Sequence, residues 1–161
     1  LEKCKNVDDG IKALKELPIA SSCNILLVDK SGKMVVAECN PLEIKIRYPE
    51  KNENGEDFII TVNHFTSRKM WKHDRSNRNV YSSETRYETA NNVLKDAGYK
   101  NSVQHAKNIL SGKFGFMCQY EKELNFKTIW SSVFDITNNK IYRAEGDPRK
   151  TKFIEDKRLF N

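Results

Sequence analysis

The chain has 161 residues, of which 38% are hydrophobic and 31% are charged. This composition is typical of a folded domain with a core rather than of a disordered chain, and the length suits a single domain, residues 1–161. No apolar run approaches the roughly 20 residues that a transmembrane helix needs, and no signal peptide is visible, so we expect a cytoplasmic protein without a membrane partner. Because the sequence opens with Leu1 rather than Met, we expect a piece of a longer or processed protein.

The charges and cysteines exclude some kinds of site. The net charge of +6, from 28 basic and 22 acidic side chains, fits a solvated surface as well as a polyanion partner. The four cysteines have no C-x-x-C spacing, which argues against a zinc site and a disulfide scaffold: Cys4, Cys23, Cys39 and Cys118. We therefore expect reduced thiols, no metal and no cofactor.

The first half of the chain predicts one helix followed by antiparallel strands. Residues 6–17 read as a helix capped by Asn6 and used for packing. Strands are expected at four places along the following stretch: 24–28, 34–38, 42–48 and 58–62. In the third strand an alternating pattern puts Glu43, Lys45 and Arg47 on a solvated face. The short turns between the strands predict a four-stranded antiparallel meander rather than βαβ units.

The fourth predicted strand ends in Asn63 and His64, and this is where we look for chemistry. Polar side chains at the end of a buried strand are costly unless they are hydrogen-bonded, and strand ends often carry ligand-binding groups. Two interpretations of Asn63 remain open. It either caps a turn, or its side-chain NH2 is a fixed donor aimed at a developing oxyanion.

Residues 64–81 show no periodicity and form the most basic part of the chain, with Arg68, Lys69, Lys72, His73, Arg75 and Arg78. Long irregular segments in compact domains are often functional or mobile. This segment is either a solvated loop, a phosphate-contacting flap or a nucleic-acid contact.

The second half predicts two helices and a hairpin. A helix begins at Ser82 or Ser83 and runs to about Asp96, and its first turn contains Arg86, where a cation opposes the helix dipole. The guanidinium is therefore either solvated or paired with an acidic or thiolate partner. A shorter helix spans residues 102–110, and strands 128–134 and 141–144 form a hairpin.

The ordered set of motifs resembles the C-terminal part of an acyl-coenzyme A:6-aminopenicillanic acid acyltransferase-like protein. That group is related to the choloylglycine hydrolases, and both are N-terminal-nucleophile (Ntn) hydrolases. The resemblance covers residues 6 to 148 and rests on five stretches: Ser22-Cys23-Asn24-Ile25-Leu26-Leu27-Val28-Asp29-Lys30-Ser31-Gly32, Val35-Val36-Ala37-Glu38-Cys39-Asn40-Pro41, Val62-Asn63-His64-Phe65, Thr85-Arg86-Tyr87 and Ile129-Trp130-Ser131-Ser132-Val133-Phe134-Asp135.

The resemblance implies an α+β fold, part of an αββα sandwich with antiparallel sheets and packing helices. It also implies hydrolysis of a linear amide, or transfer of its acyl group, through a thioester on an N-terminal Cys. In the family's pattern the oxyanion-hole donor corresponds to Asn63, and the arginine near the nucleophile corresponds to Arg86. We further expect His64, Phe65 and Met70 to contact the substrate.

The family's nucleophile lies in an N-terminal half that this sequence does not contain. Cys4, Cys23 and Cys118 do not match its position and are expected to pack, so the chain alone should be inactive. The expected partners are a small acyl amide or acyl-coenzyme A and the N-terminal half of the same protein, with a homo-oligomer left open. Two alternatives are a non-catalytic binding module of the same fold and, less favoured, a basic nucleic-acid-binding domain.

Overall fold

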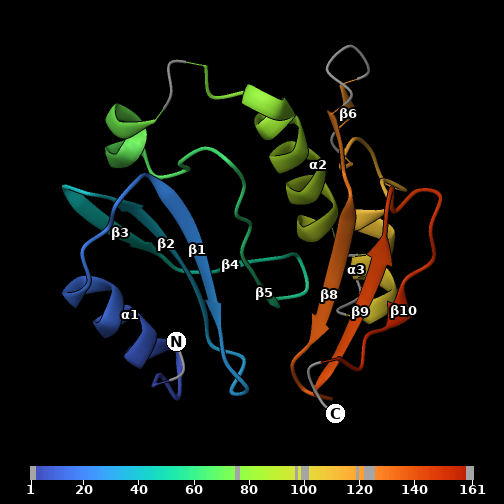
Figure 1. Cartoon of the computed structure of the whole chain (residues 1–161), viewed down its shortest axis with the longest axis horizontal. Coiled ribbons are helices and arrows are strands. Elements are labelled where there is room, and N and C mark those ends of the chain that lie inside the picture. The colour runs from blue at the N-terminus through green and yellow to red at the C-terminus, as the bar shows by residue number, and fades with distance from the viewer. Residues whose placement is uncertain are drawn as a thin grey trace. The chain divides into compact units, whose positions relative to one another are not determined.

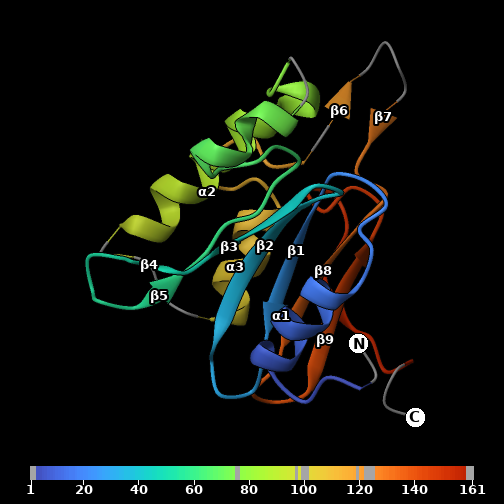
Figure 2. The same cartoon turned by 90° about the vertical axis from the view of Figure 1, so that its left-hand side faces the viewer.

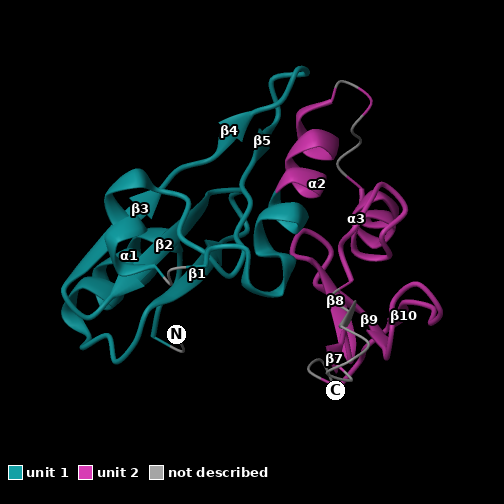
Figure 3. Cartoon of the chain, turned by 90° about the horizontal axis from the view of Figure 1, so that it is seen from above, with its two compact units in different colours: residues 1–87 teal, residues 88–161 magenta. Residues whose placement is uncertain are grey.

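The computed structural model describes residues 3–74, 77–96, 98, 102–118, 120–121 and 126–158. The chain divides into two compact units, residues 1–87 and 88–161, which Figure 3 colours separately. Each unit contains helical segments and antiparallel strands, and each is described by itself below.

The first unit is built on a three-stranded antiparallel sheet covered by a helix (Figures 1 and 2). Helix α1 (Val7–Glu16) is capped by the Asn6 side chain, which accepts a hydrogen bond from the Asp9 N–H at 2.9 Å. Its Gly10 lies against Leu27 of the sheet, where an added Cβ would come within 3.0 Å of a leucine methyl. The absence of a side chain at position 10 therefore allows close packing of the helix on the sheet.

The sheet has the order β1-β2-β3, with strands β1 (Cys23–Val28), β2 (Met34–Asn40) and β3 (Glu43–Arg47). A tight turn joins β1 to β2, in which Gly32 adopts a φ of 85° and donates its N–H to the Asp29 carbonyl at 3.1 Å. Most of β2 is buried, with Val35, Val36 and Ala37 at 0% exposure. The predicted helix 6–17 and the first three predicted strands are thus confirmed to within a few residues.

The fourth strand of the predicted meander is wrong. A separate two-stranded ribbon forms from β4 (Glu50–Lys51) and β5 (Asp57–Phe58), and no strand covers residues 59–62. Residues 59–62 do not form a ladder because side chains bind their backbone instead. Arg47 donates to the Ile60 carbonyl at 2.6 Å, and Asn24 donates to the Val62 carbonyl at 2.8 Å.

The predicted solvated face of β3 also needs correction at one residue. The Arg47 side chain is only 14% exposed and forms an ion pair with the fully buried Glu38 of β2, with 2.8 Å between Nε and Oε1. The face is partly buried here because the segment of residues 60–67 lies across it. This segment accepts hydrogen bonds from Asn24 of β1 and Arg47 of β3 and donates to Glu38 of β2.

The irregular segment after residue 64 contains the 3-10 helices η1 (Arg68–His73) and η2 (Val80–Ser82). Its basic side chains are partly neutralised. Lys72 and His73 both contact Glu43, and Arg78 pairs with Asp74. Arg75, part of the predicted basic run, lies outside the described residues.

Helix α2 (Ser83–Lys95) begins where predicted and runs from the first unit into the second. The second unit adds α3 (Val103–Leu110), capped by Ser102, and a three-stranded sheet of order β10-β9-β8. Its strands are β8 (Trp130–Asp135), β9 (Lys140–Glu145) and β10 (Ile154–Glu155), and a small ribbon joins β6 (Tyr120–Glu121) to β7 (Phe126–Lys127). The predicted hairpin is confirmed as the β8–β9 pair.

Candidate active site

Asn63 and Arg86, which are 23 positions apart in the sequence, meet in the first unit. Arg86 Nη2 donates to Asn63 Oδ1 at 2.6 Å. Because a guanidinium only donates hydrogen bonds, this contact identifies the oxygen end of the amide, and the Asn63 NH2 group is left to face another acceptor. The arrangement suits a side chain that must donate a hydrogen bond in a fixed direction.

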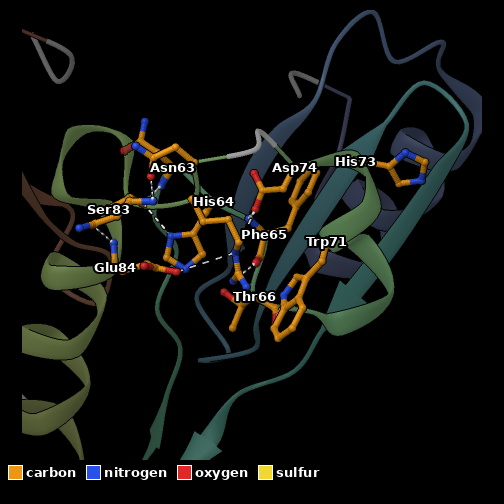
Figure 4. A network of polar contacts seen from close by, with 12 residues as sticks. Asn63, His64, Phe65, Thr66, Trp71, His73, Asp74, Ser83 and Glu84 are labelled. Atoms are coloured by element: carbon orange, nitrogen blue, oxygen red, sulfur yellow. Dashed lines mark hydrogen bonds and ion pairs between the residues drawn. The ribbon is translucent and has the colours of Figure 1, made fainter.

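Ser83 holds the backbone beside this amide (Figure 4). The serine opens α2, is fully buried, and accepts a hydrogen bond from the Asn63 N–H at 3.0 Å. The same hydroxyl lies 2.9 Å from Nδ1 of His64. Since the Ser83 oxygen already accepts from Asn63, its own proton is free to be donated to His64, which then carries its proton on Nε2.

His64 is buried, with 5% exposure. Burial lowers the pKa of the His64 imidazole below its ordinary value of 6.5, and the nearby Arg78 lowers it further. Desolvation disfavours the imidazolium, so the ring is neutral at pH 7. A neutral ring matches the hydrogen bond donated by Ser83.

Phe65 and Met70 are both buried, but only Phe65 reaches the cavity described below. Phe65 is 3% exposed, and its N–H donates to Asp74 Oδ2 at 2.9 Å (Figure 4). Its carbonyl accepts from Arg78 Nη2 at 2.9 Å. Met70, in η1, has 0% exposure and is not among the cavity-lining residues in the described part of the chain. The predicted contact of Met70 with substrate stays a prediction.

A cavity of about 490 Å³ opens beside Asn63 in the first unit. Four of the five residues that we singled out from the sequence line it, namely Asn63, His64, Phe65 and Arg86. Its other walls come from the start of β1, the preceding backbone of the Asn63 segment and the turn before α2: Ser22, Cys23, Asn24, Thr61, Val62, His73, Asp74, Asn77, Arg78, Val80 and Tyr81. Volumes of this order hold small-molecule ligands.

Arg86 is a half-buried cation in the wall of the cavity. Burial lowers the pKa of the Arg86 guanidinium, and no Asp or Glu within the described ranges forms an ion pair with it. Its contact is instead the neutral oxygen of Asn63. The dipole of α2 also places partial positive charge here, so the site favours a ligand atom that carries or develops negative charge.

The backbone next to the cavity departs from ordinary geometry. Tyr81 and Ser82, immediately before α2, have φ values of 60° and 54°, in the left-handed region that non-glycine residues rarely adopt. Such conformations cost free energy and cluster at functional sites. Here they bring Tyr81 to the cavity wall and Ser83 under Asn63.

Two of the cysteines are poor nucleophiles in this structure. Burial, followed by the proximity of Cys23, raises the pKa of the Cys39 thiol to about 11, and burial also raises the pKa of Cys118. The Cys118 thiol donates to the Leu110 carbonyl at 3.1 Å. Both thiols are therefore protonated at neutral pH, whereas the reactive form of cysteine is the thiolate.

Within the described ranges, no group of three or more His, Cys, Asp and Glu side chains is arranged to hold a metal ion. None of the helices described here is long and apolar enough to cross a membrane.

Sequence reasoning missed three residues that hold the site together: Asn24, Glu38 and Ser83. Glu38 is fully buried and accepts hydrogen bonds from the N–H groups of Thr66 and Ser67, at 2.7 and 3.1 Å. The only signal in the sequence was a carboxylate inside an otherwise apolar strand, which usually needs a buried partner. Nothing in the sequence indicated which segment that partner would come from.

The antiparallel sheets, the helices and an asparagine at the wall of a cavity define an α+β protein with a candidate small-molecule site. The chain matches the family model of acyl-coenzyme A:6-aminopenicillanic acid acyl-transferase over residues 1–150, and it belongs to that family. The resemblance read from the sequence is therefore confirmed, as is the fold class of α+β with antiparallel sheets, within the Ntn hydrolases. No curated protein matches the chain.

Proposed function

We propose that this chain is the C-terminal part of a linear-amide hydrolase or acyltransferase whose nucleophile, an N-terminal Cys, comes from residues outside it. The single observation that carries the proposal is the Asn63–Arg86 contact at the cavity wall. It leaves one NH2 donor of fixed orientation beside a space that can hold an acyl group. Family membership makes acyl transfer the expected reaction class.

In the proposed reaction, the cysteine thiolate attacks the carbonyl carbon of the bound acyl amide, and the carbonyl oxygen becomes an oxyanion. Asn63 Nδ2 donates a hydrogen bond to that oxyanion. Arg86 holds the side-chain amide of Asn63 in place and adds positive electrostatic potential at the oxyanion. Before the attack, the α-amino group of the cysteine takes the proton of its own thiol, and the resulting ammonium passes that proton to the leaving amine as the C–N bond breaks. Water or an acceptor amine attacks the resulting thioester, which releases the acid or the new amide and restores the thiol.

The lining of the cavity supports a division of roles for the substrate. Val62, Phe65, Val80 and Tyr81 offer apolar or aromatic surface for the acyl chain. His64, being buried and neutral, acts as a wall and anchor of this site rather than as its base. The acyl donor is a small amide or an acyl-coenzyme A.

The basic segment gives less support to a nucleic-acid contact. Lys72, His73 and Arg78 already have carboxylate partners, and Arg78 stacks on Trp71 with its guanidinium carbon 4.2 Å from the ring centroid. A phosphate-binding surface needs cations that are free to replace counterions. We therefore keep the acyl-transfer proposal as the function.

The test is the substitution Asn63→Ala in the full-length protein that contains the nucleophile. Removing one oxyanion donor should lower kcat by about 10²- to 10³-fold, with little change in KM, because the hydrogen bond strengthens in the transition state. Turnover of a panel of acyl amides and acyl-coenzyme A thioesters is measured. Asn138→Ala is the matched control, since Asn138 is an exposed amide whose side chain donates to Asp135 in the turn between β8 and β9. Unchanged turnover in Asn63→Ala would reject the proposed role.

A further inference from the structure

Asn24, near the start of β1, forms an unusual pair of hydrogen bonds. Its single Nδ2 group donates to the Val62 carbonyl at 2.8 Å and to the His64 carbonyl at 2.9 Å. These two carbonyls belong to the residues on either side of Asn63. Asn24 therefore ties both flanks of the candidate oxyanion donor to the central sheet.

The other end of the same amide is not used. Asn24 Oδ1 is buried and, within the described part of the chain, has no hydrogen-bond partner. A buried acceptor without a partner costs free energy, and an apolar side chain at this position would avoid that cost. The donor end therefore accounts for the presence of an amide here, and local violations of this kind are expected at functional sites.

The remaining contacts of Asn63 do not duplicate what Asn24 does. Ser83 accepts from the Asn63 N–H, and Arg86 donates to the side-chain oxygen. Both of these partners sit at the start of α2, whereas Asn24 belongs to the sheet. The Val62 carbonyl belongs to the peptide unit that leads into Asn63, and the His64 carbonyl belongs to the unit that follows His64. Holding both carbonyls restrains the backbone on either side of Asn63 and with it the direction of the Asn63 Cα–Cβ bond.

We propose that Asn24 is a positioning residue for the oxyanion donor: it orients Asn63 without touching the substrate's reacting atoms. This inference rests on the proposed function. A donor displaced by about 1 Å can lower the rate roughly 10²-fold. Loss of Asn24 should thus lower kcat by about 10- to 100-fold. Although Asn24 lines the cavity, its Nδ2 is bound to two backbone carbonyls and its Oδ1 is buried, so it offers no polar atom to the substrate and KM should change little.

The experiment uses three substitutions in the full-length protein. Asn24→Ala removes both donated hydrogen bonds, and Asn24→Ser keeps a hydroxyl that can donate only one. Asn24→Asp keeps the size of the side chain but faces both carbonyls with a carboxylate. Asn138→Ala is the control, because Asn138 is also an amide but its side chain donates to Asp135 in the turn between β8 and β9 rather than to the Asn63 segment.

Two measurements are made on each variant. The first is the 15N heteronuclear NOE of the Asn63 side-chain NH2, assigned by its disappearance in Asn63→Ala. The second is kcat and KM for the acyl amide panel. The expected result is a lower NOE and a lower kcat in Asn24→Ala and Asn24→Asp, an intermediate loss in Asn24→Ser, and no change in Asn138→Ala. Circular dichroism checks that each variant folds. If Asn24→Ala and Asn24→Asp do not fold, the NOE and kcat of Asn24→Ser test the positioning role.

The outcomes separate this inference from the proposed function. If Asn63→Ala lowers kcat but the Asn24 variants keep both the NOE and kcat of the parent, the positioning role is overturned and the oxyanion role stands. If Asn63→Ala has no effect on turnover, the proposed function is rejected, and with it any catalytic purpose for Asn24. A fall in the NOE would then support only the structural half of the inference.

Discussion

Replacing Glu38 by Gln tests how strongly the sheet holds the Asn63 segment. Glu38 is fully buried, its Arg47 partner is 14% exposed, and their closest atoms are 2.8 Å apart. The carboxylate also accepts from the N–H groups of Thr66 and Ser67. One side chain therefore neutralises a nearly buried cation and fixes the backbone just beyond Asn63.

The expected loss of stability follows from which atoms the glutamine can keep. Oε1 accepts the shortest hydrogen bond, from the Thr66 N–H, and is the oxygen in the ion pair with Arg47 Nε, so a glutamine oxygen can take its place there. The charge cannot be replaced, so Arg47 becomes an uncompensated cation. Breaking a buried ion pair from one side costs about 3–5 kcal/mol, and we expect the lower end, about 3 kcal/mol. For a protein of this size that lowers Tm by about 6–12 °C.

Thermal unfolding of the full-length protein, followed by circular dichroism, measures this loss. Asp8→Asn is the control, because its ion pair with Lys33 is exposed and should contribute nothing measurable. Adding Arg47→Met to Glu38→Gln should recover part of the loss, since it removes the unpaired cation. A Tm for Glu38→Gln within 1 °C of the parent would refute the reasoning, because the buried charge would then contribute nothing.

Two further predictions follow from the pKa directions. The pKa of His64 is lowered in the folded state from its ordinary value of 6.5, so below that pH the unfolded chain binds a proton that the folded chain does not. The free energy of unfolding should therefore fall as the pH drops below about 6.5. His64→Gln should flatten this pH dependence, as measured by urea titrations at pH 5.5 and 7.5. Equal slopes in parent and variant would contradict a neutral buried ring. Cys39 and Cys118, whose thiol pKa values are raised by burial, should resist iodoacetamide at pH 7 and react once the protein is unfolded in urea, as followed by mass spectrometry. Labelling of either residue in the folded protein at the rate of the exposed Cys23 would show that the thiol is not protected.

Local sequence patterns were enough to predict the helices and strands that depend on interactions between residues close together in the chain. The Asn6 cap and the apolar stripe after it predict α1, and the alternation and turns between residues 24 and 48 predict the sheet. The order of motifs also pointed to the family and to Asn63 and Arg86. Hydrogen bonds within a few residues, and side chains sorted between two faces, are readable from a single chain.

Only the tertiary structure shows the features that depend on hydrogen bonds and ion pairs between residues far apart in the sequence. Residues 59–62 have the composition of a strand, yet the side chains of Arg47 and Asn24 bind the carbonyls of Ile60 and Val62, and these residues form no ladder. The strand pattern predicts a solvent-facing Arg47, but in the structure Arg47 is nearly buried and forms an ion pair with the buried Glu38. A pattern of residue types shows that a buried polar group needs a partner, but only the folded chain shows which one, because the partner lies far away in sequence and is chosen by geometry.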